Sequence, residues 1–211
     1  PSVCGENLMN NKFDLALVPV GILPQLKDYY LVSDYCISAD GAVQTVCLFS
    51  EVPLNEIKEV YLDYHSKTSI QLVQVLCKEF WKIRPNFIPA ENNFENNIKG
   101  STAGVIIGDR SFEYCSKYQY VYDLSEQWKV FTGLPFVFAC WVSTKELDAD
   151  FQHQFSNELA FGLAHLDEAL KEKEHLFDTK IDKRNYLNQV ISYHLDEDKR
   201  KAMKLFLEFI S

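Results

Sequence analysis

Several motifs that mark common catalytic and metal sites are missing from this chain. It contains no G-x-S-x-G, no P-loop and no G-x-G-x-x-G, which excludes the usual hydrolase, nucleotide and dinucleotide sites. Its five histidines show no metal-binding spacing, and only His65 adjoins a candidate site described below. We therefore expect no metal ion and no cofactor.

Glycine and proline are scarce, with 8 and 7 among 211 residues. Apolar residues make up 47% of the chain and aromatic residues 14%. This composition excludes a disordered or fibrous protein and is typical of a globular one. A chain of this length can form one large domain or two small lobes.

Basic residues are fewer than acidic ones, 21 against 30, which gives a formal net charge of −9. A general nucleic-acid surface needs a basic stripe, so we expect no nucleic-acid partner. A small anionic ligand remains compatible with this charge, because the start of a helix can bind it even in an acidic protein.

The six cysteines never form a C-x-x-C pair, and most lie among apolar neighbours. We interpret them as buried free thiols, which favours a reducing cytoplasm. No signal peptide or membrane-spanning run is visible, so we expect no membrane partner. The oligomeric state stays open, with a dimer as one alternative.

The order of apolar runs predicts an α/β protein. Strands are expected at 13–20, 29–38 and 43–49, the last two as a hairpin or a bent pair. From Pro53 to about Tyr122 the order β-α-β-α-β predicts parallel strands. Helical spacing follows at 147–173, and two shorter helices are expected at 185–194 and 197–209.

The stretch from Trp128 to Ser143 connects these two parts. It begins with a turn at Thr132–Pro135 and continues with an aromatic run at 136–142, which predicts a strand buried on both faces of a parallel or mixed sheet. We expect lobe 1 to contain residues 1–50 and 128–211, and lobe 2 residues 51–127. Two crossings between lobes predict a ligand cleft at the carboxyl ends of the strands.

Three hydroxyl side chains, Ser66, Thr68 and Ser69, stand at the start of a predicted helix. A helix start with free N–H groups can bind a carboxylate or phosphate, although simple N-capping by Ser66 is an alternative. Thr45 stands at the start of a strand, where its hydroxyl can point into a cleft or to the surface. Asp109 follows a strand and can serve as a general base or as the cap of a helix beginning at Ser111.

Five segments closely resemble the chorismate dehydratases of the futalosine route to menaquinone. They are SADGAVQTVCLFS (38–50), HSKTSIQLV (65–73), GVIIGDRSFE (104–113), YVYDLSEQWKVFTGLPFVFACWV (120–142) and FGLAHLDEAL (161–170). The resemblance runs in order over nearly the whole chain, and the segment at 120–142 is its most specific part. A sister enzyme, which cleaves cyclic dehypoxanthine futalosine, shares the fold but has motifs less similar to these.

The resemblance implies a two-lobed periplasmic-binding-protein-like fold of type II, here without the family's N-terminal strand and its Ser-Tyr-Leu-Asn-Thr-type motif. It implies a lyase that removes water from chorismate to give 3-[(1-carboxyvinyl)oxy]benzoate, with no cofactor. The proton is taken by a substrate carboxylate or by Asp109. The implied binding residues, found in four segments of the chain, are Thr45, Ser66, Thr68, Ser69, Gly108, Thr132, Gly133 and Leu134.

Two other functions are compatible with such a fold. One is a solute-binding protein without catalytic activity, and the other is the ligand-sensing part of a regulator. Both would bind a small carboxylate, so the formation of a product distinguishes them from the enzyme.

Overall fold

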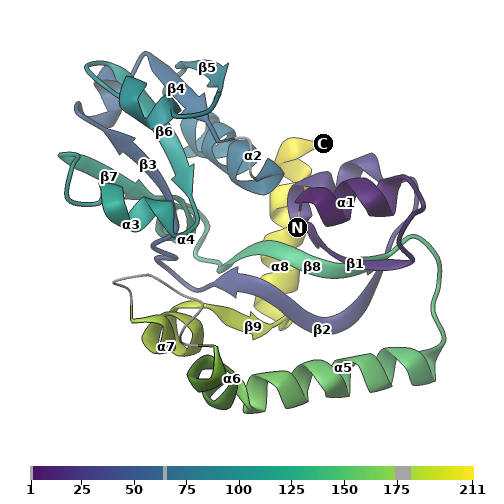
Figure 1. Ribbon diagram of the computed structural model, residues 1–211. Coiled ribbons are helices and arrows are strands. Elements are labelled where there is room, and N and C mark those ends of the chain that lie inside the picture. Colours follow the sequence, from purple (N-terminus) through teal and green to yellow (C-terminus); the bar gives the residue numbers. More distant parts are fainter. Residues whose placement is uncertain (1, 64–65, 174–181) are drawn as a thin grey trace.

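A computed structural model of the chain describes residues 2–63, 66–173 and 182–211. Its strands form two sheets, one above the other in Figure 1. The mixed α/β architecture predicted from the apolar runs is confirmed. None of the helices in the described ranges is both long enough and apolar enough to span a membrane.

The lower sheet has four strands in the order β1-β8-β2-β9. Their bounds are Leu15–Pro19 for β1, Phe136–Ser143 for β8, Tyr30–Ala39 for β2 and Ser192–His194 for β9. All three pairings are antiparallel. Strand β8 therefore lies between two antiparallel neighbours, so the prediction of a parallel or mixed surrounding for this run was wrong. An apolar run shows that a strand is buried but not the direction of its partners.

The upper sheet has five strands in the order β5-β4-β6-β3-β7. Their bounds are Asn86–Pro89 for β5, Glu59–Leu62 for β4, Thr102–Ile107 for β6, Val46–Ser50 for β3 and Tyr120–Asp123 for β7. Strand β4 is parallel to both β5 and β6, as the alternating pattern predicted. Strand β3 is antiparallel to both β6 and β7.

Strands β2 and β3 belong to different sheets, so the predicted hairpin or bent pair does not form. The chain crosses from one sheet to the other between Ala39 and Val46. Strand β3 thus pairs with the strands of lobe 2, although residues up to 50 were assigned to lobe 1. The return crossing runs through α4, Leu124–Thr132, into β8, so both crossings lie between the two sheets (Figure 1).

The remaining helices cover the two sheets. The α-helices are α1 (Ser2–Met9), α2 (Lys67–Val75), α3 (Arg110–Tyr114), α5 (Ala149–Ala164), α6 (Leu166–Glu172), α7 (Lys183–Asn185) and α8 (Glu197–Ile210). Short 3₁₀ segments are η1 (Val20–Gln25), η2 (Leu54–Glu56) and η4 (Phe94–Asn97), and π segments are η3 (Leu76–Phe80) and η6 (Tyr186–Val190). The helix predicted at 185–194 is helical only as far as Val190, and β9 follows, because the backbone becomes extended at Ile191.

Aromatic side chains fill the core where α4 and α8 meet β8. The ring centroids of Trp128 and Phe136 lie 5.4 Å apart, and Phe206 from α8 lies 5.1 Å from Phe136. All three side chains are almost completely buried. The indole N–H of Trp128 donates to the carbonyl of Pro135 at 3.1 Å, so this large side chain is packed without leaving its polar atom unsatisfied. The return crossing is therefore fixed in the core.

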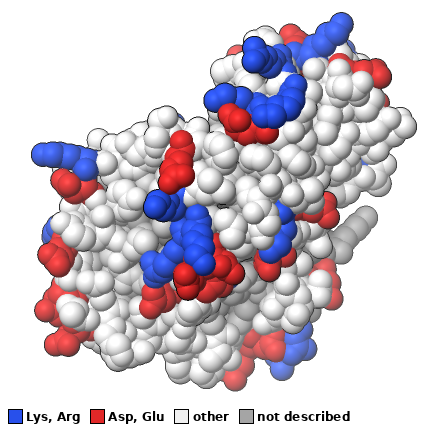
Figure 2. Space-filling view, turned by 180° about the vertical axis from the view of Figure 1, so that it is seen from behind, with Lys and Arg blue, Asp and Glu red and all other residues white. Residues whose placement is uncertain are grey.

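Charged side chains of both signs intermingle on the face opposite to that of Figure 1. Figure 2 shows Lys and Arg beside Asp and Glu over this face. Among the described residues on this face, neither sign forms a broad continuous region. This face therefore offers no basic stripe for a phosphate backbone.

Candidate functional site

One edge of the five-stranded sheet collects several of the predicted site residues. Strands β4 and β6 are parallel, so their carboxyl ends meet at this edge. Strand β3 runs the other way, with Val46 paired to Ile107, so its first residues lie at the same edge. The edge therefore brings Thr45, which precedes β3, next to Gly108 and Asp109, which follow β6.

Thr45 is held at this edge by its backbone and its side chain. Its carbonyl accepts a hydrogen bond from the N–H of Gly108 at 2.8 Å. Its hydroxyl lies 2.7 Å from the phenolic oxygen of Tyr186 and 3.5 Å from the carbonyl of Val43. Thr45 is 7% exposed, so this hydroxyl is directed inward rather than toward the surface.

Helix α2 begins after β4, at the same edge. Ser66 is its N-cap, and its hydroxyl accepts hydrogen bonds from the Ser69 N–H at 3.2 Å and the Ser69 hydroxyl at 2.9 Å. The capping role of Ser66 is therefore confirmed. The N–H groups of Lys67 and Thr68 precede any intrahelical acceptor and carry the positive end of the helix dipole. His65, which stands just before this helix, lies outside the described residues.

Thr68 connects helix α2 to the other sheet. Its hydroxyl donates to the carbonyl of Phe138 in β8 at 3.1 Å and accepts from the N–H of Gly21 in η1 at 3.0 Å. The side chain is 1% exposed. These two bonds give Thr68 a structural role between the lobes, and its contact with a ligand stays a prediction.

Asp109 is exposed and occupies the N-cap position of α3. Its carboxylate makes no capping hydrogen bond within the described part of the chain, and α3 begins at Arg110 rather than at Ser111. The Asp109 side chain therefore does not act as the cap of α3. Gly108, just before it, has φ +72°, a left-handed conformation that favours glycine.

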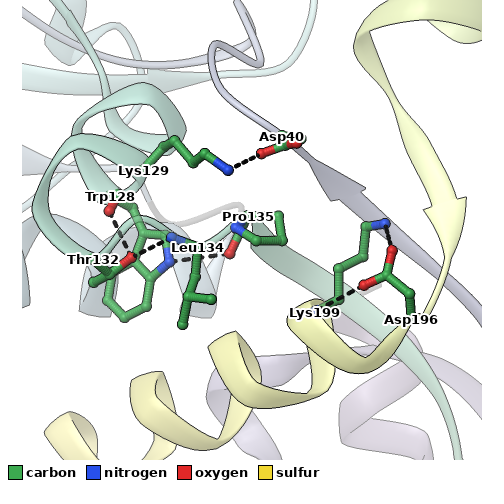
Figure 3. A network of polar contacts seen from close by, with 8 residues as sticks. All are labelled: Asp40, Trp128, Lys129, Thr132, Leu134, Pro135, Asp196 and Lys199. Atoms are coloured by element: carbon green, nitrogen blue, oxygen red, sulfur yellow. Dashed lines mark hydrogen bonds and ion pairs between the residues drawn. The ribbon is translucent and has the colours of Figure 1, made fainter.

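The turn at Thr132–Pro135 closes the end of α4 (Figure 3). The Thr132 hydroxyl donates to the carbonyl of Trp128 at 2.9 Å and accepts from the N–H of Leu134 at 3.1 Å. Gly133 has φ +76° and ends the helix in the left-handed conformation. The turn leads into β8 and the four-stranded sheet, so the predicted binding by Thr132, Gly133 and Leu134 would come from the opposite side to Thr45.

An ion-paired group that the motifs did not reveal joins the ends of β4 and β6 to the start of α3. The carboxylate of Asp63, at the end of β4, accepts from the N–H of Ile107 at 3.3 Å and pairs with Arg110. Arg110 also donates to Glu95 at 2.6 Å. Asp63 and Glu95 are buried, so the shared arginine compensates two carboxylates and fixes the start of α3 beside β4.

Tyr186 is the other residue that the sequence did not single out. It begins the π segment η6, and its ring packs edge-on against Phe112 of α3, with centroids 6.1 Å apart. Burial raises the pKa of its phenol above the usual value, the hydrogen bond to Thr45 opposes this, and the nearby carboxylates of Asp109 and Asp123 add to it. Tyr186 is therefore a protonated donor at neutral pH. Because 141 positions separate it from Thr45, no local spacing could have indicated the pair.

A family model described as menaquinone biosynthesis matches residues 1–211. The chain belongs to the menaquinone biosynthesis family. The match spans the whole of the sequence, including both crossings and the edge that carries Thr45, Ser66 and Asp109. The resemblance seen in the five sequence segments is thus confirmed at the level of the family and its pathway.

Solved structures support the fold independently. The chain is similar to the crystal structure of protein AF1704 from Archaeoglobus fulgidus, with a TM-score of 0.72, 15% identity, and coverage of 98% of this chain and 81% of that one. It is also similar to an ABC transporter from Parabacteroides distasonis, with a TM-score of 0.64, 17% identity, and coverage of 100% and 78%. The predicted periplasmic-binding-protein-like fold is confirmed.

The arrangement can bind an anion and accept a proton. The α2 start offers N–H groups and the Ser66 hydroxyl to a carboxylate, and the paired hydroxyls of Thr45 and Tyr186 offer a further donor. The Asp109 carboxylate is exposed at the same edge and can accept a proton. These are the groups that a small carboxylate substrate would require.

Proposed function

We propose that this protein is a lyase that removes water from chorismate and forms 3-[(1-carboxyvinyl)oxy]benzoate. The observation that carries the proposal is the meeting of the α2 start with Thr45 and Asp109 at one edge of the five-stranded sheet. Membership of the menaquinone biosynthesis family supports it, because the sequence motifs resemble the dehydratases of that pathway. The protein is expected to act in the cytoplasm, which agrees with its six free cysteines.

The substrate has chemistry that suits this edge. Chorismate carries two carboxylates, and one of them is expected at the start of α2, near Ser66 and Ser69. The helix dipole and the N–H groups there favour a negative charge. Thr45 donates to a second oxygen of the substrate, and the turn at 132–134 closes over it from the other lobe. Oriented binding of this kind lowers the barrier by fixing the reacting groups beforehand.

The reaction breaks a ring C–H bond and a ring C–OH bond, and the ring becomes aromatic as water leaves. Aromatisation supplies the driving force, so the protein needs chiefly to orient the proton acceptor and the leaving hydroxyl. A carboxylate of the substrate can take the proton. Asp109 is the acceptor from the protein if the substrate carboxylate does not act.

The direct test is to incubate the protein with chorismate and to follow the mixture by mass spectrometry. The proposal predicts a product lighter than chorismate by one water, formed in proportion to protein concentration and missing from samples with heat-denatured protein. Binding of chorismate without any product would instead favour a solute-binding or sensing function. Neither binding nor product from folded protein would reject both.

Replacing Asp109 by Asn then separates the two possible proton acceptors. If Asp109 takes the proton, Asp109→Asn abolishes product formation while chorismate still binds. If a substrate carboxylate takes it, product formation persists in the variant. Asp28→Asn is a matched control, because Asp28 is exposed and lies between η1 and β2, away from the edge that carries Asp109.

A further inference from the structure

Tyr186 belongs to one lobe and contacts the binding edge of the other. Its segment, η6, leads directly into β9, which pairs with β2 in the four-stranded sheet. Its hydroxyl and its ring nevertheless contact Thr45 and Phe112, which flank β3 and β6 of the five-stranded sheet. The side chain therefore spans the boundary between the lobes at the edge where we place the substrate.

Tyr186 and Thr45 carry two hydroxyl protons, and the hydrogen bond between them requires only one. Their oxygens lie 2.7 Å apart, so one O–H proton lies between them and the other remains for a third acceptor. The described acceptor near Thr45 is the carbonyl of Val43, at 3.5 Å, which is long for an O–H bond. Whichever hydroxyl donates within the pair, the other keeps one O–H proton for a further acceptor.

We infer that Tyr186 is a positioning residue, which fixes the Thr45 hydroxyl so that the pair donates one hydrogen bond to an oxygen of the substrate. This inference rests on the proposed function for the identity of that substrate. A threonine hydroxyl rotates freely unless a partner holds it, and a partner from the opposite lobe holds it only when the lobes are correctly placed. A hydroxyl that accepts one hydrogen bond is polarised by it, and therefore donates a stronger hydrogen bond to the next acceptor.

The geometry around Tyr186 is suited to this role. Its ring packs edge-on against Phe112, on the side of the five-stranded sheet, and this contact supports the hydroxyl in its place beside Thr45. The phenol is partly buried, and its pKa is raised mainly by that burial, so it keeps its proton at neutral pH. A tyrosinate would be unable to donate, and the pair would then lose its spare proton.

The test uses Tyr186→Phe, which removes the hydroxyl and keeps the ring on Phe112. Tyr193→Phe is the matched control, because Tyr193 lies on β9 of the same segment and is also partly buried. Chorismate affinity is measured by calorimetry for both variants. The loss of one hydrogen bond, worth about 1 kcal/mol, should make the affinity of Tyr186→Phe for chorismate roughly three- to tenfold weaker. The affinity of Tyr193→Phe should be unchanged.

Variants at Thr45 test whether the two hydroxyls act as a unit. Thr45→Ser keeps the hydroxyl and is expected to bind chorismate like the unmodified protein, while Thr45→Val loses affinity. The double variant Thr45→Val with Tyr186→Phe should be no weaker than Thr45→Val alone. Additive losses, or equal effects of Tyr186→Phe and Tyr193→Phe, would overturn the inference.

A measurement without ligand separates this inference from the proposed function. In protein labelled at threonine methyl groups, NMR reports the rotamer of Thr45. Tyr186→Phe is expected to average the Thr45 rotamer, whereas Tyr193→Phe leaves it unchanged. If the unmodified protein fails to bind chorismate, the proposed function is rejected and this readout still decides the role of Tyr186. An unchanged Thr45 rotamer in Tyr186→Phe would reject the positioning role.

Discussion

At the scale of single residues, the start of α2 combines a capping serine with a buried serine whose hydroxyl bonds to that cap. Ser66 receives both bonds from Ser69 and completes the first turn. Ser69 is 1% exposed and donates its hydroxyl within that turn. The two serines therefore differ in what their removal should cost, although they are only three positions apart.

Replacing Ser69 by Ala should weaken chorismate binding by roughly three- to tenfold and leave the melting temperature within about two to four degrees, because the cap at Ser66 remains. Ser66→Ala removes the cap and should lower the free energy of unfolding by about 1 kcal/mol. Calorimetry and thermal unfolding measure the two effects. A large loss of stability in Ser69→Ala with unchanged binding would show that the serine only supports the helix.

The cysteines give a second test at this scale. Burial raises the pKa of Cys77 to about 12 and that of Cys140 to about 12, so at pH 8 only about one thiol in 10⁴ is ionised. Cys115 is exposed. A thiol reagent at pH 8 should label Cys115 first, and label Cys77 and Cys140 only after denaturant unfolds the protein. Peptide mapping identifies the sites, and prompt labelling of Cys77 in folded protein would contradict its burial.

At the scale of elements, Asp123 links helix α4 to the crossing before β3. One carboxylate oxygen accepts from the N–H groups of Ser125 at 3.0 Å and Glu126 at 3.1 Å, and the other accepts from Gln44 at 2.6 Å. The side chain thus caps α4 and fixes the residue next to Thr45. Its removal affects a helix and the binding edge together.

Asp123→Ala should lower the free energy of unfolding by about 2 to 4 kcal/mol, since it removes a cap and leaves the Gln44 N–H without this acceptor. Asp148→Ala is the matched control. Asp148 caps the exposed start of α5 through the N–H groups of Asp150 and Phe151 alone, so its loss should cost about 1 kcal/mol. Urea unfolding measures both, and equal costs would show that the bond to Gln44 contributes little.

Local signals predicted the elements whose boundaries are local. Ser66 before an amphipathic run predicted α2, and the Thr132–Pro135 turn predicted a break before β8, which the structure shows at the end of α4. Local signals failed where pairing is long-range. Strands β2 and β3 are adjacent in sequence but join different sheets, and β9 forms only because Ser192 and His194 pair with β2, more than 150 positions earlier.

The site was predictable to a similar extent. The residues that follow β4 and β6 could be expected at one edge, because parallel strands bring their carboxyl ends together. The position of Thr45 beside them could not, because β3 was expected to pair with β2 and instead lies antiparallel to β6. The Tyr186 hydroxyl and the shared Arg110 could not, since both depend on contacts between distant segments. The position of Thr68 in the first turn of α2 predicted a ligand contact. Its hydroxyl instead accepts from the N–H of Gly21 and donates to the carbonyl of Phe138.

At the scale of the whole molecule, polar contacts join the two lobes at two places. Thr68 of α2 bonds to η1 and β8, and the Thr45 and Tyr186 pair joins η6 to the β3 edge. The first turn of α2 thus follows a strand of one sheet and bonds to a strand of the other. A ligand at that N-terminus would contact groups whose positions both lobes determine.

The measurement that tests this account most directly is a crystal structure of the protein with chorismate or its dehydrated product bound. The account predicts one carboxylate within hydrogen-bonding distance of the Ser66–Ser69 turn and another ligand oxygen at the Thr45 hydroxyl. Asp109 would lie beside the ring. A ligand bound elsewhere, for example in the groove lined by Gln71, Lys78 and Phe209 between α2 and α8, would contradict it.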